Sequence, residues 1–173
     1  GMDILGCVIE KASNMSFGNF LKKNIFEPLQ MNDTFFKVPE AKRSRMTNLY
    51  AHHNAFKAFS VDIPKELKGK KPKMYLIDSS RDSLFYKNIT VEDGGSGLVS
   101  TASDYSNFAQ MLLDKGVYKG KRILSDDSFN TLVSNQLNEK NSRFRGFGMG
   151  ITLGIALDSK KIRLRRGDNS FFW

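Results

Sequence analysis

A glycine-rich turn followed directly by an amphipathic helix constrains this chain more than any other feature. The turn is Gly94–Gly97, and its three glycines permit positive φ angles and close approach to a neighbouring backbone. Thr101 can cap the following helix, with Asp104 three residues later completing a pair of the capping-box kind. The sequence therefore predicts a tight loop at the edge of a cleft, leading into a helix with one buried stripe. That stripe comprises residues 105, 108, 109, 112 and 113, so Tyr105 is expected in the core.

A glycine loop ahead of a helix can also bind phosphate, but the surrounding residues argue against that function. No lysine follows at P-loop spacing, and the sequence contains no Gly-x-Gly-x-x-Gly pattern. His52 and His53 are adjacent, without Cys, Asp or Glu at the spacing of a metal site. The sequence therefore predicts neither a cofactor nor a bound metal.

Periodic apolar residues predict three further helices. The first spans residues 3–13, and the second begins after Ser16 and ends before Pro28, so the two form an αα-hairpin. The third begins after Ser125, where acidic residues suit the N-terminal end of the helix dipole. The expected buried faces are residues 4, 5, 8, 9 and 12, then Phe17, Phe20, Leu21 and Ile25, and finally Phe129, Leu132, Val133 and Leu137.

Most strands that the sequence predicts are short. Apolar runs predict strands at 75–77, 83–86, 147–157 and 162–164, with loops at 138–146 and 158–161. Four helices and a few antiparallel strands indicate an α+β fold that is rich in helix.

The composition is that of a globular protein. Of 173 residues, 40% are hydrophobic, the mean hydropathy is −0.40, and no run approaches the ~20 apolar residues that span a bilayer. The length suits one domain. The single cysteine, Cys7, excludes an intrachain disulfide, and its apolar neighbours predict a buried structural residue rather than a reactive thiol.

Positive charge is concentrated in one part of the chain. Of the net charge of +9, residues 37–73 contribute +7, because ten basic residues stand there against three acidic ones. Aromatic residues are interleaved, without the spacing of a nucleic-acid-binding motif. We therefore interpret residues 37–93 as a solvated, variable excursion of the chain, and we expect no nucleic-acid partner. The alternative is that segment 37–73 binds an anionic partner.

Three segments, in order, resemble serine β-lactamases and penicillin-binding-protein-like hydrolases of the class C and esterase branch. Asp3–Phe17 is similar to the helix after the family's Tyr-x-Asn motif. Residues 20–34 are similar to the family segment Ile-Phe-x-Pro-Leu-Gly-Met-x-Asp-Thr, and residues 94–113 to its glycine loop and helix. The resemblance implies a partial, helix-rich β-lactamase/transpeptidase-like fold. Residues 1–173 would form a single incomplete domain from the middle of the family's sequence.

The family's catalytic motifs are absent from this sequence. No serine has a lysine three positions later, which is the arrangement of the family's nucleophile. Tyr-x-Asn occurs at Tyr86 and Tyr105, but not at the family's position, and Trp173 is a candidate for the first residue of the Lys/His/Trp-x-Gly strand. No catalytic residue is therefore predicted. By resemblance, the substrate cleft is lined by Gly95, Ser96 and Gly97.

Two interpretations of the function follow. The resemblance implies a parent enzyme, of the periplasm or cell envelope, that cleaves a β-lactam, a D-Ala-type peptide or a small ester through an acyl-enzyme. The present chain would be an inactive fragment of that enzyme and would self-associate through the apolar surface that an incomplete fold exposes. The alternative is a non-catalytic binding module that uses the basic segment 37–73, with the glycine loop as a purely structural turn.

Overall fold

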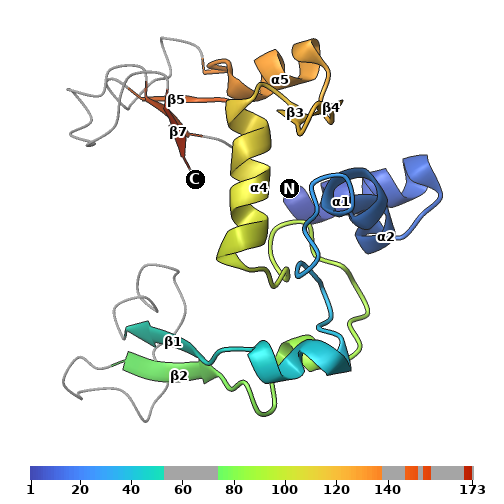
Figure 1. The fold of residues 1–173 in the computed structure, drawn as a ribbon, viewed down its shortest axis with the longest axis vertical. Helices are drawn as coiled ribbons and strands as arrows, with labels where there is room; N and C mark the ends of the chain where they lie inside the picture. Colours follow the sequence, from blue (N-terminus) through green and yellow to red (C-terminus); the bar gives the residue numbers. More distant parts are fainter. Residues whose placement is uncertain (53–73, 138–146, 152–153, 157–169, 173) are drawn as a thin grey trace. The chain divides into compact units, whose positions relative to one another are not determined.

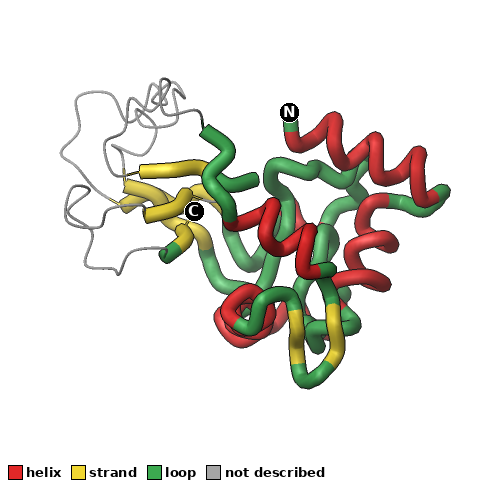
Figure 2. The backbone as a smooth tube through the Cα atoms, turned by 90° about the horizontal axis from the view of Figure 1, so that it is seen from above, coloured by secondary structure: helices red, strands yellow, loops and turns green. Residues whose placement is uncertain are grey.

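The computed structural model describes residues 1–52, 74–137, 147–151, 154–156 and 170–172 (Figure 1). Contacts divide the chain into two compact units: unit 1 comprises residues 1–22 and 33–101, and unit 2 comprises 23–32 and 102–173. Long loops, green in Figure 2, join short elements. The helical elements are α1 (Met2–Ser13), α2 (Phe17–Leu21), the π-helix η1 (Lys22–Phe26), the 3₁₀ helices η2 (Glu40–Arg45) and η4 (Leu84–Tyr86), α4 (Ala102–Leu113) and α5 (Asp126–Val133).

The described strands form three small antiparallel sheets. They are β1 (Leu49–His52) with β2 (Met74–Asp78), β3 (Val117–Tyr118) with β4 (Lys121–Arg122), and β5 (Phe147–Met149), β6 (Gly154–Ala156) and β7 (Phe171–Phe172) in that order. The mixture of helices with a few antiparallel strands confirms the predicted α+β class.

Helices α1 and α2 form the predicted αα-hairpin in unit 1. The hydroxyl of Ser16 caps α2 by accepting a hydrogen bond from the Asn19 N–H at 3.2 Å. Gly6 is the buried residue of α1, and it lies against the Phe17 ring. Phe17 in turn packs against Phe36, with ring centroids 5.8 Å apart. The core of unit 1 therefore begins at the point where α1 meets α2.

The apolar stripe predicted for α1 is exposed, so that prediction was wrong. Ile4, Leu5 and Val8 are 70%, 47% and 54% exposed, and Cys7, which was expected to be buried, is exposed as well. The helix packs through Gly6 instead, because a residue without a side chain lets the neighbouring ring approach the helix backbone. The larger apolar side chains lie on the rest of the helix surface.

Unit 2 is built around Leu29, which is fully buried. Asn107 of α4 donates a hydrogen bond from Nδ2 to the Leu29 carbonyl at 3.0 Å, and Met111, one turn further along α4, is 1% exposed. The face of α4 that carries Asn107 therefore turns toward segment 23–32. Tyr105 and Leu113, which were predicted in the core, are consequently 60% and 68% exposed. The periodicity was right, but the buried face is displaced by about one residue.

Local signals set the ends of the unit 2 elements as predicted. Helix α4 begins directly after Thr101, and it ends where the Gly116 N–H donates to the Met111 carbonyl at 2.9 Å. The Ser125 hydroxyl caps α5 by accepting from the Ser128 N–H at 3.1 Å, and Phe129 of α5 is buried as expected.

Two predicted strands have a different structure. Residues 83–86 contain η4, because the Ser83 hydroxyl accepts from the Phe85 N–H at 3.2 Å and stabilises a turn in place of an extended chain. Residues 147–157 contain β5 and β6, which pair with each other as a hairpin. Just after β5, the Ile151 N–H donates to the carbonyl of Leu132 in α5 at 3.1 Å. The elements predicted at 138–146, 158–161 and 162–164, and Trp173, lie outside the described residues.

Candidate active-site loop and the pocket of unit 1

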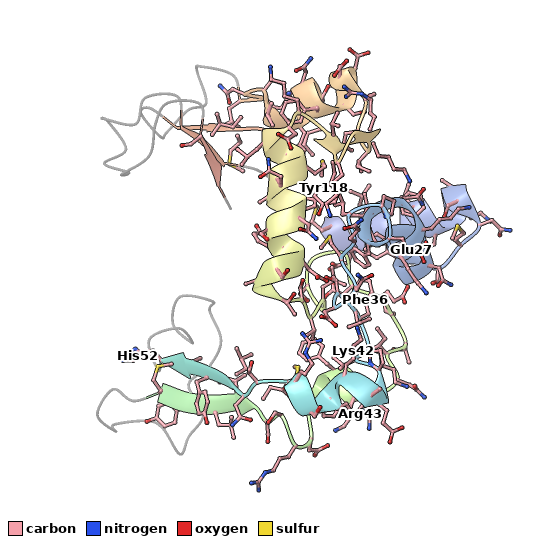
Figure 3. The ribbon with its side chains drawn as sticks, viewed as in Figure 1. Glu27, Phe36, Lys42, Arg43, His52 and Tyr118 are labelled. Carbon is pink, nitrogen blue, oxygen red and sulfur yellow. The ribbon has the colours of Figure 1, made fainter. Side chains whose placement is uncertain are left out.

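The predicted loop Gly94–Gly97 lies against the beginning of α1 within unit 1. A Cβ atom on Gly94 would clash with the carbonyl oxygen of Met2, so only glycine allows this close approach. Gly97 has a φ of 87°, in the left-handed region that favours glycine, and it lies against the Phe36 ring that Figure 3 labels. The loop is thus held by backbone geometry to the first residues of the helix.

Two carboxylates also hold the loop. The Gly95 N–H donates to Asp3 Oδ1 at 2.9 Å and to Asp93 Oδ1 at 2.8 Å, and the Ser96 hydroxyl donates to Asp93 Oδ2 at 2.5 Å. The hydrogen bond from Asp3 is the main cause that lowers the pKa of Asp93 to about 2, and the Ser96 bond adds to it. The same contact with Asp93 raises the pKa of Asp3. The two carboxylates, which both accept from the Gly95 N–H, therefore link α1 to the loop.

The structure brings the predicted cleft residues together on one loop, with Gly95 and Ser96 exposed and Gly97 half-buried. Sequence reasoning missed Asp3 and Asp93. Asp93 could have been found, because an aspartate that accepts from the N–H two residues later is a common turn signal before glycine. Nothing local to Asp3 indicated its role.

Replacing Asp93 with asparagine is expected to return the pKa of Asp3 toward its ordinary value, because the neighbouring Asp93 carboxylate is the main cause that raises it. In the native chain, the contribution of Asp93 to stability is present above its usual pKa and is lost as the pH falls toward about 2. The contribution of Asp3 has the opposite sign: it is present at low pH and is lost as the pH rises through its raised pKa. An NMR titration of the Asp3 carboxyl carbon measures the midpoint.

The matched control for that titration is Asp82→Asn, which removes an exposed carboxylate elsewhere in unit 1. It should leave the Asp3 midpoint unchanged. Equal midpoints in the Asp93→Asn chain and the native chain would show that Asp93 does not raise the pKa of Asp3.

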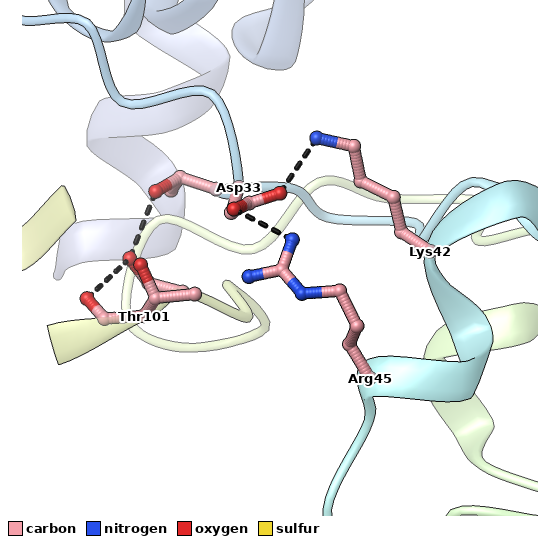
Figure 4. A network of polar contacts seen from close by, with 6 residues as sticks. Asp33, Lys42, Arg45 and Thr101 are labelled. Carbon is pink, nitrogen blue, oxygen red and sulfur yellow. Dashed lines mark hydrogen bonds and ion pairs between the residues drawn. The ribbon is translucent and has the colours of Figure 1, made fainter. Parts of the chain in front are cut away.

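A second polar cluster of unit 1 surrounds Asp33 (Figure 4). Asp33 accepts from Lys42 Nζ at 2.6 Å and from Arg45 Nη1 at 2.8 Å, and these two hydrogen bonds lower its pKa, with Lys42 the larger cause. Next to it, the hydroxyls of Thr34 and Ser100 are hydrogen-bonded at 2.8 Å. The cluster joins η2 to the segment that follows the glycine loop.

The two Tyr-x-Asn matches have different surroundings. The Tyr86 hydroxyl donates to the Ser80 carbonyl at 2.7 Å, and the guanidinium of Arg43, which Figure 3 labels on η2, lies 4.8 Å from the centre of the Tyr86 ring. Tyr105 lies on the exposed face of α4. The described residues contain no cluster of three or more potential metal-ligating side chains. No described helix is long and apolar enough to cross a bilayer.

The chain belongs to the β-lactamase family, whose profile matches residues 1–162. A curated relative, Protein Rv1367c of Mycobacterium tuberculosis, is 24% identical over an alignment 173 residues long. The alignment covers 94% of this chain and 38% of that protein. The present chain thus spans under two fifths of the length of this relative.

Two solved structures share the fold of this chain. Simvastatin synthase (LovD6 mutant) from Aspergillus terreus superposes with a TM-score of 0.66 at 18% identity, covering 90% of this chain and 38% of that one. An octameric penicillin-binding protein homologue from Pyrococcus abyssi superposes with a TM-score of 0.56 at 22% identity, covering 89% and 28%. The predicted membership of this hydrolase family and the partial β-lactamase-like fold are confirmed.

Proposed function

We propose that this chain supplies part of the scaffold of a serine hydrolase in which the Gly95–Gly97 loop lines the substrate cleft. The observation that carries the proposal is the attachment of the loop to Met2 and Asp3 at the start of α1. In the family, the Tyr-x-Asn motif stands a few residues ahead of this helix. A loop held against the start of α1 would therefore lie close to the residues that transfer protons in an intact enzyme.

The proposed substrate of the intact enzyme is an amide or an ester, such as a β-lactam, a D-Ala-type peptide or a small ester, cleaved through an acyl-enzyme. The exposed Ser96 side chain would be the polar contact, and its bond to Asp93 would fix the hydroxyl in one orientation. The proposed compartment is the periplasm or the cell envelope.

Substituting tryptophan for the serine equivalent to Ser96 in an intact relative tests the role in the cleft. A side chain of that size should lower kcat/KM at least tenfold while changing the melting temperature little, because Ser96 is exposed. The matched control is tryptophan at the equivalent of Ser103, an exposed serine of α4. Unchanged kcat/KM in the Ser96 variant would leave the loop as a structural turn.

The 173-residue chain itself is proposed to be inactive, because no serine in it has a lysine three positions later. Binding and electrostatic features alone cannot replace an absent nucleophile at useful rates. Incubation with nitrocefin and with p-nitrophenyl acetate should release chromophore no faster than an unrelated protein at equal concentration. Turnover at enzyme-like rates would contradict this proposal and leave the family assignment intact.

Self-association of the chain is a further part of the proposal. It is supported by the exposed residues Ile4, Leu5 and Val8 of α1 and by the octameric state of the Pyrococcus abyssi homologue. Size-exclusion chromatography at two concentrations should show an oligomer, and a monomer at both concentrations would contradict it. The family match over residues 1–162 supports the hydrolase scaffold rather than the alternative, a non-catalytic module that uses segment 37–73 for an anionic partner, and residues 53–73 lie outside the described part of the chain.

A further inference from the structure

Unit 1 contains a pocket of about 470 Å³, and Asp33, Lys42 and Arg45 form part of its lining. Its size lies within the range of small-molecule sites. Its walls are largely apolar, and they include Phe35, Val38, Leu98 and Val99. The backbone groups of Phe35 and Val99 are already hydrogen-bonded to each other, so these walls present mainly side-chain carbon to the interior.

Two cations stand at the polar side of this pocket and share one carboxylate. Asp33 binds both Lys42 and Arg45, so these three side chains together carry one net positive charge. The ammonium group of Lys42 also lies 5.2 Å from the centre of the Phe35 ring, which holds it over the apolar wall. Both cationic groups are thus oriented before any ligand arrives, which lowers the entropic cost of binding.

Asp78 also lines the pocket but is engaged within its own turn. Its carboxylate accepts from the Ser83 hydroxyl at 2.5 Å and from the Leu84 N–H at 3.1 Å. Both carboxylates that line the pocket, Asp78 and Asp33, are therefore already hydrogen-bonded to groups of unit 1.

Arg45 retains capacity for another acceptor. Its guanidinium presents five N–H groups in a planar fork, and within the described residues Asp33 accepts from one nitrogen, Nη1. The Arg45 side chain is 58% exposed, so a ligand can reach it from solvent. Figure 4 shows this guanidinium beside Asp33. A planar carboxylate is the group that such a fork binds best.

We propose that this pocket binds a small carboxylate with an apolar ring or chain. The ligand's carboxylate binds the free N–H groups of Arg45, and its apolar part lies against Phe35, Leu98 and Val99. This site is separate from the proposed contact of Ser96 with substrate, and it does not depend on the catalytic proposal.

Titration of the full chain with phenylacetate and with phenylacetamide tests the site, because the two probes share shape and differ in charge. NMR amide shifts at Leu98 and Val99 report binding. Phenylacetate should bind at least tenfold more tightly than phenylacetamide. Arg45→Gln should abolish that difference, whereas the control Arg122→Gln, at a cation paired with Asp126 in unit 2, should preserve it.

A second variant, Leu98→Trp, tests the apolar wall should Arg45→Gln prevent folding. Leu98 is 42% exposed, so the fold should tolerate the substitution, and the larger side chain should fill the pocket and block both probes. Equal affinity for the two probes, shifts confined to other surfaces, or an affinity for phenylacetate that Arg45→Gln and Leu98→Trp leave unchanged would each overturn the proposal.

Discussion

Replacing Leu29 with alanine is expected to lower the free energy of unfolding by about 2–5 kcal/mol, the range for removing a fully buried leucine. Leu29 is 0% exposed, and its carbonyl accepts from Asn107 of α4. A cavity at this position would loosen the contact between segment 23–32 and α4 inside unit 2. Urea denaturation followed by circular dichroism measures the change.

The matched control is Leu113→Ala, which makes the same chemical change on the exposed face of α4. Leu113 is 68% exposed, so the expected change is within about 0.5 kcal/mol. Equal losses from the two variants would mean that Leu29 is not the centre of the unit 2 core.

Replacing Gly94 with alanine should cost about 1–3 kcal/mol, because the new methyl group would meet the Met2 carbonyl and force the loop away from α1. The displacement should also break the bond from the Gly95 N–H to Asp3, so the amide of Gly95 should exchange with solvent faster. Urea denaturation measures the first effect, and NMR hydrogen exchange measures the second.

Gly1→Ala is the control for this substitution, because a Cβ on Gly1 would meet no atom within 4 Å. It should leave both the stability and the exchange rate of Gly95 unchanged. A Gly94→Ala chain with native stability and native exchange would show that the loop does not lie against α1. The support for the cleft proposal would then be lost.

The Leu29 and Gly94 substitutions test the packing of the scaffold independently of the proposed chemistry. Leu29→Ala acts on unit 2, and Gly94→Ala acts on the attachment of the loop within unit 1. Neither changes a residue that contacts the phenylacetate probe in the proposed pocket. A result that contradicts one proposal therefore leaves the others open to their own tests.

Local sequence signals determined several helix ends. Ser16 and Ser125 accept hydrogen bonds from the first turns of α2 and α5, and Gly116 terminates α4, as capping chemistry predicts. The ordered resemblance of three segments also identified the family. Both kinds of signal depend on residues close together in sequence, so they need no knowledge of distant contacts.

The buried faces were decided only by tertiary structure. Periodicity predicted Ile4 and Val8 on the buried face of α1 and Tyr105 on the buried face of α4, but all three are exposed. Which face of a helix is buried depends on the partner that packs against it, and here those partners are Phe17 at Gly6 and the Leu29 carbonyl at Asn107.

The dependence on distant partners also explains which parts of the candidate site the sequence could predict. Gly95, Ser96 and Gly97 could be selected from sequence because a glycine turn is a local pattern. The partners of this loop and of the neighbouring pocket come from distant parts of the chain: Asp3 is 92 residues from Gly95, and Thr34 is 66 residues from Ser100. The sequence alone determined the caps, the turn and the family, whereas long-range packing decided which carboxylates, cations and apolar faces meet.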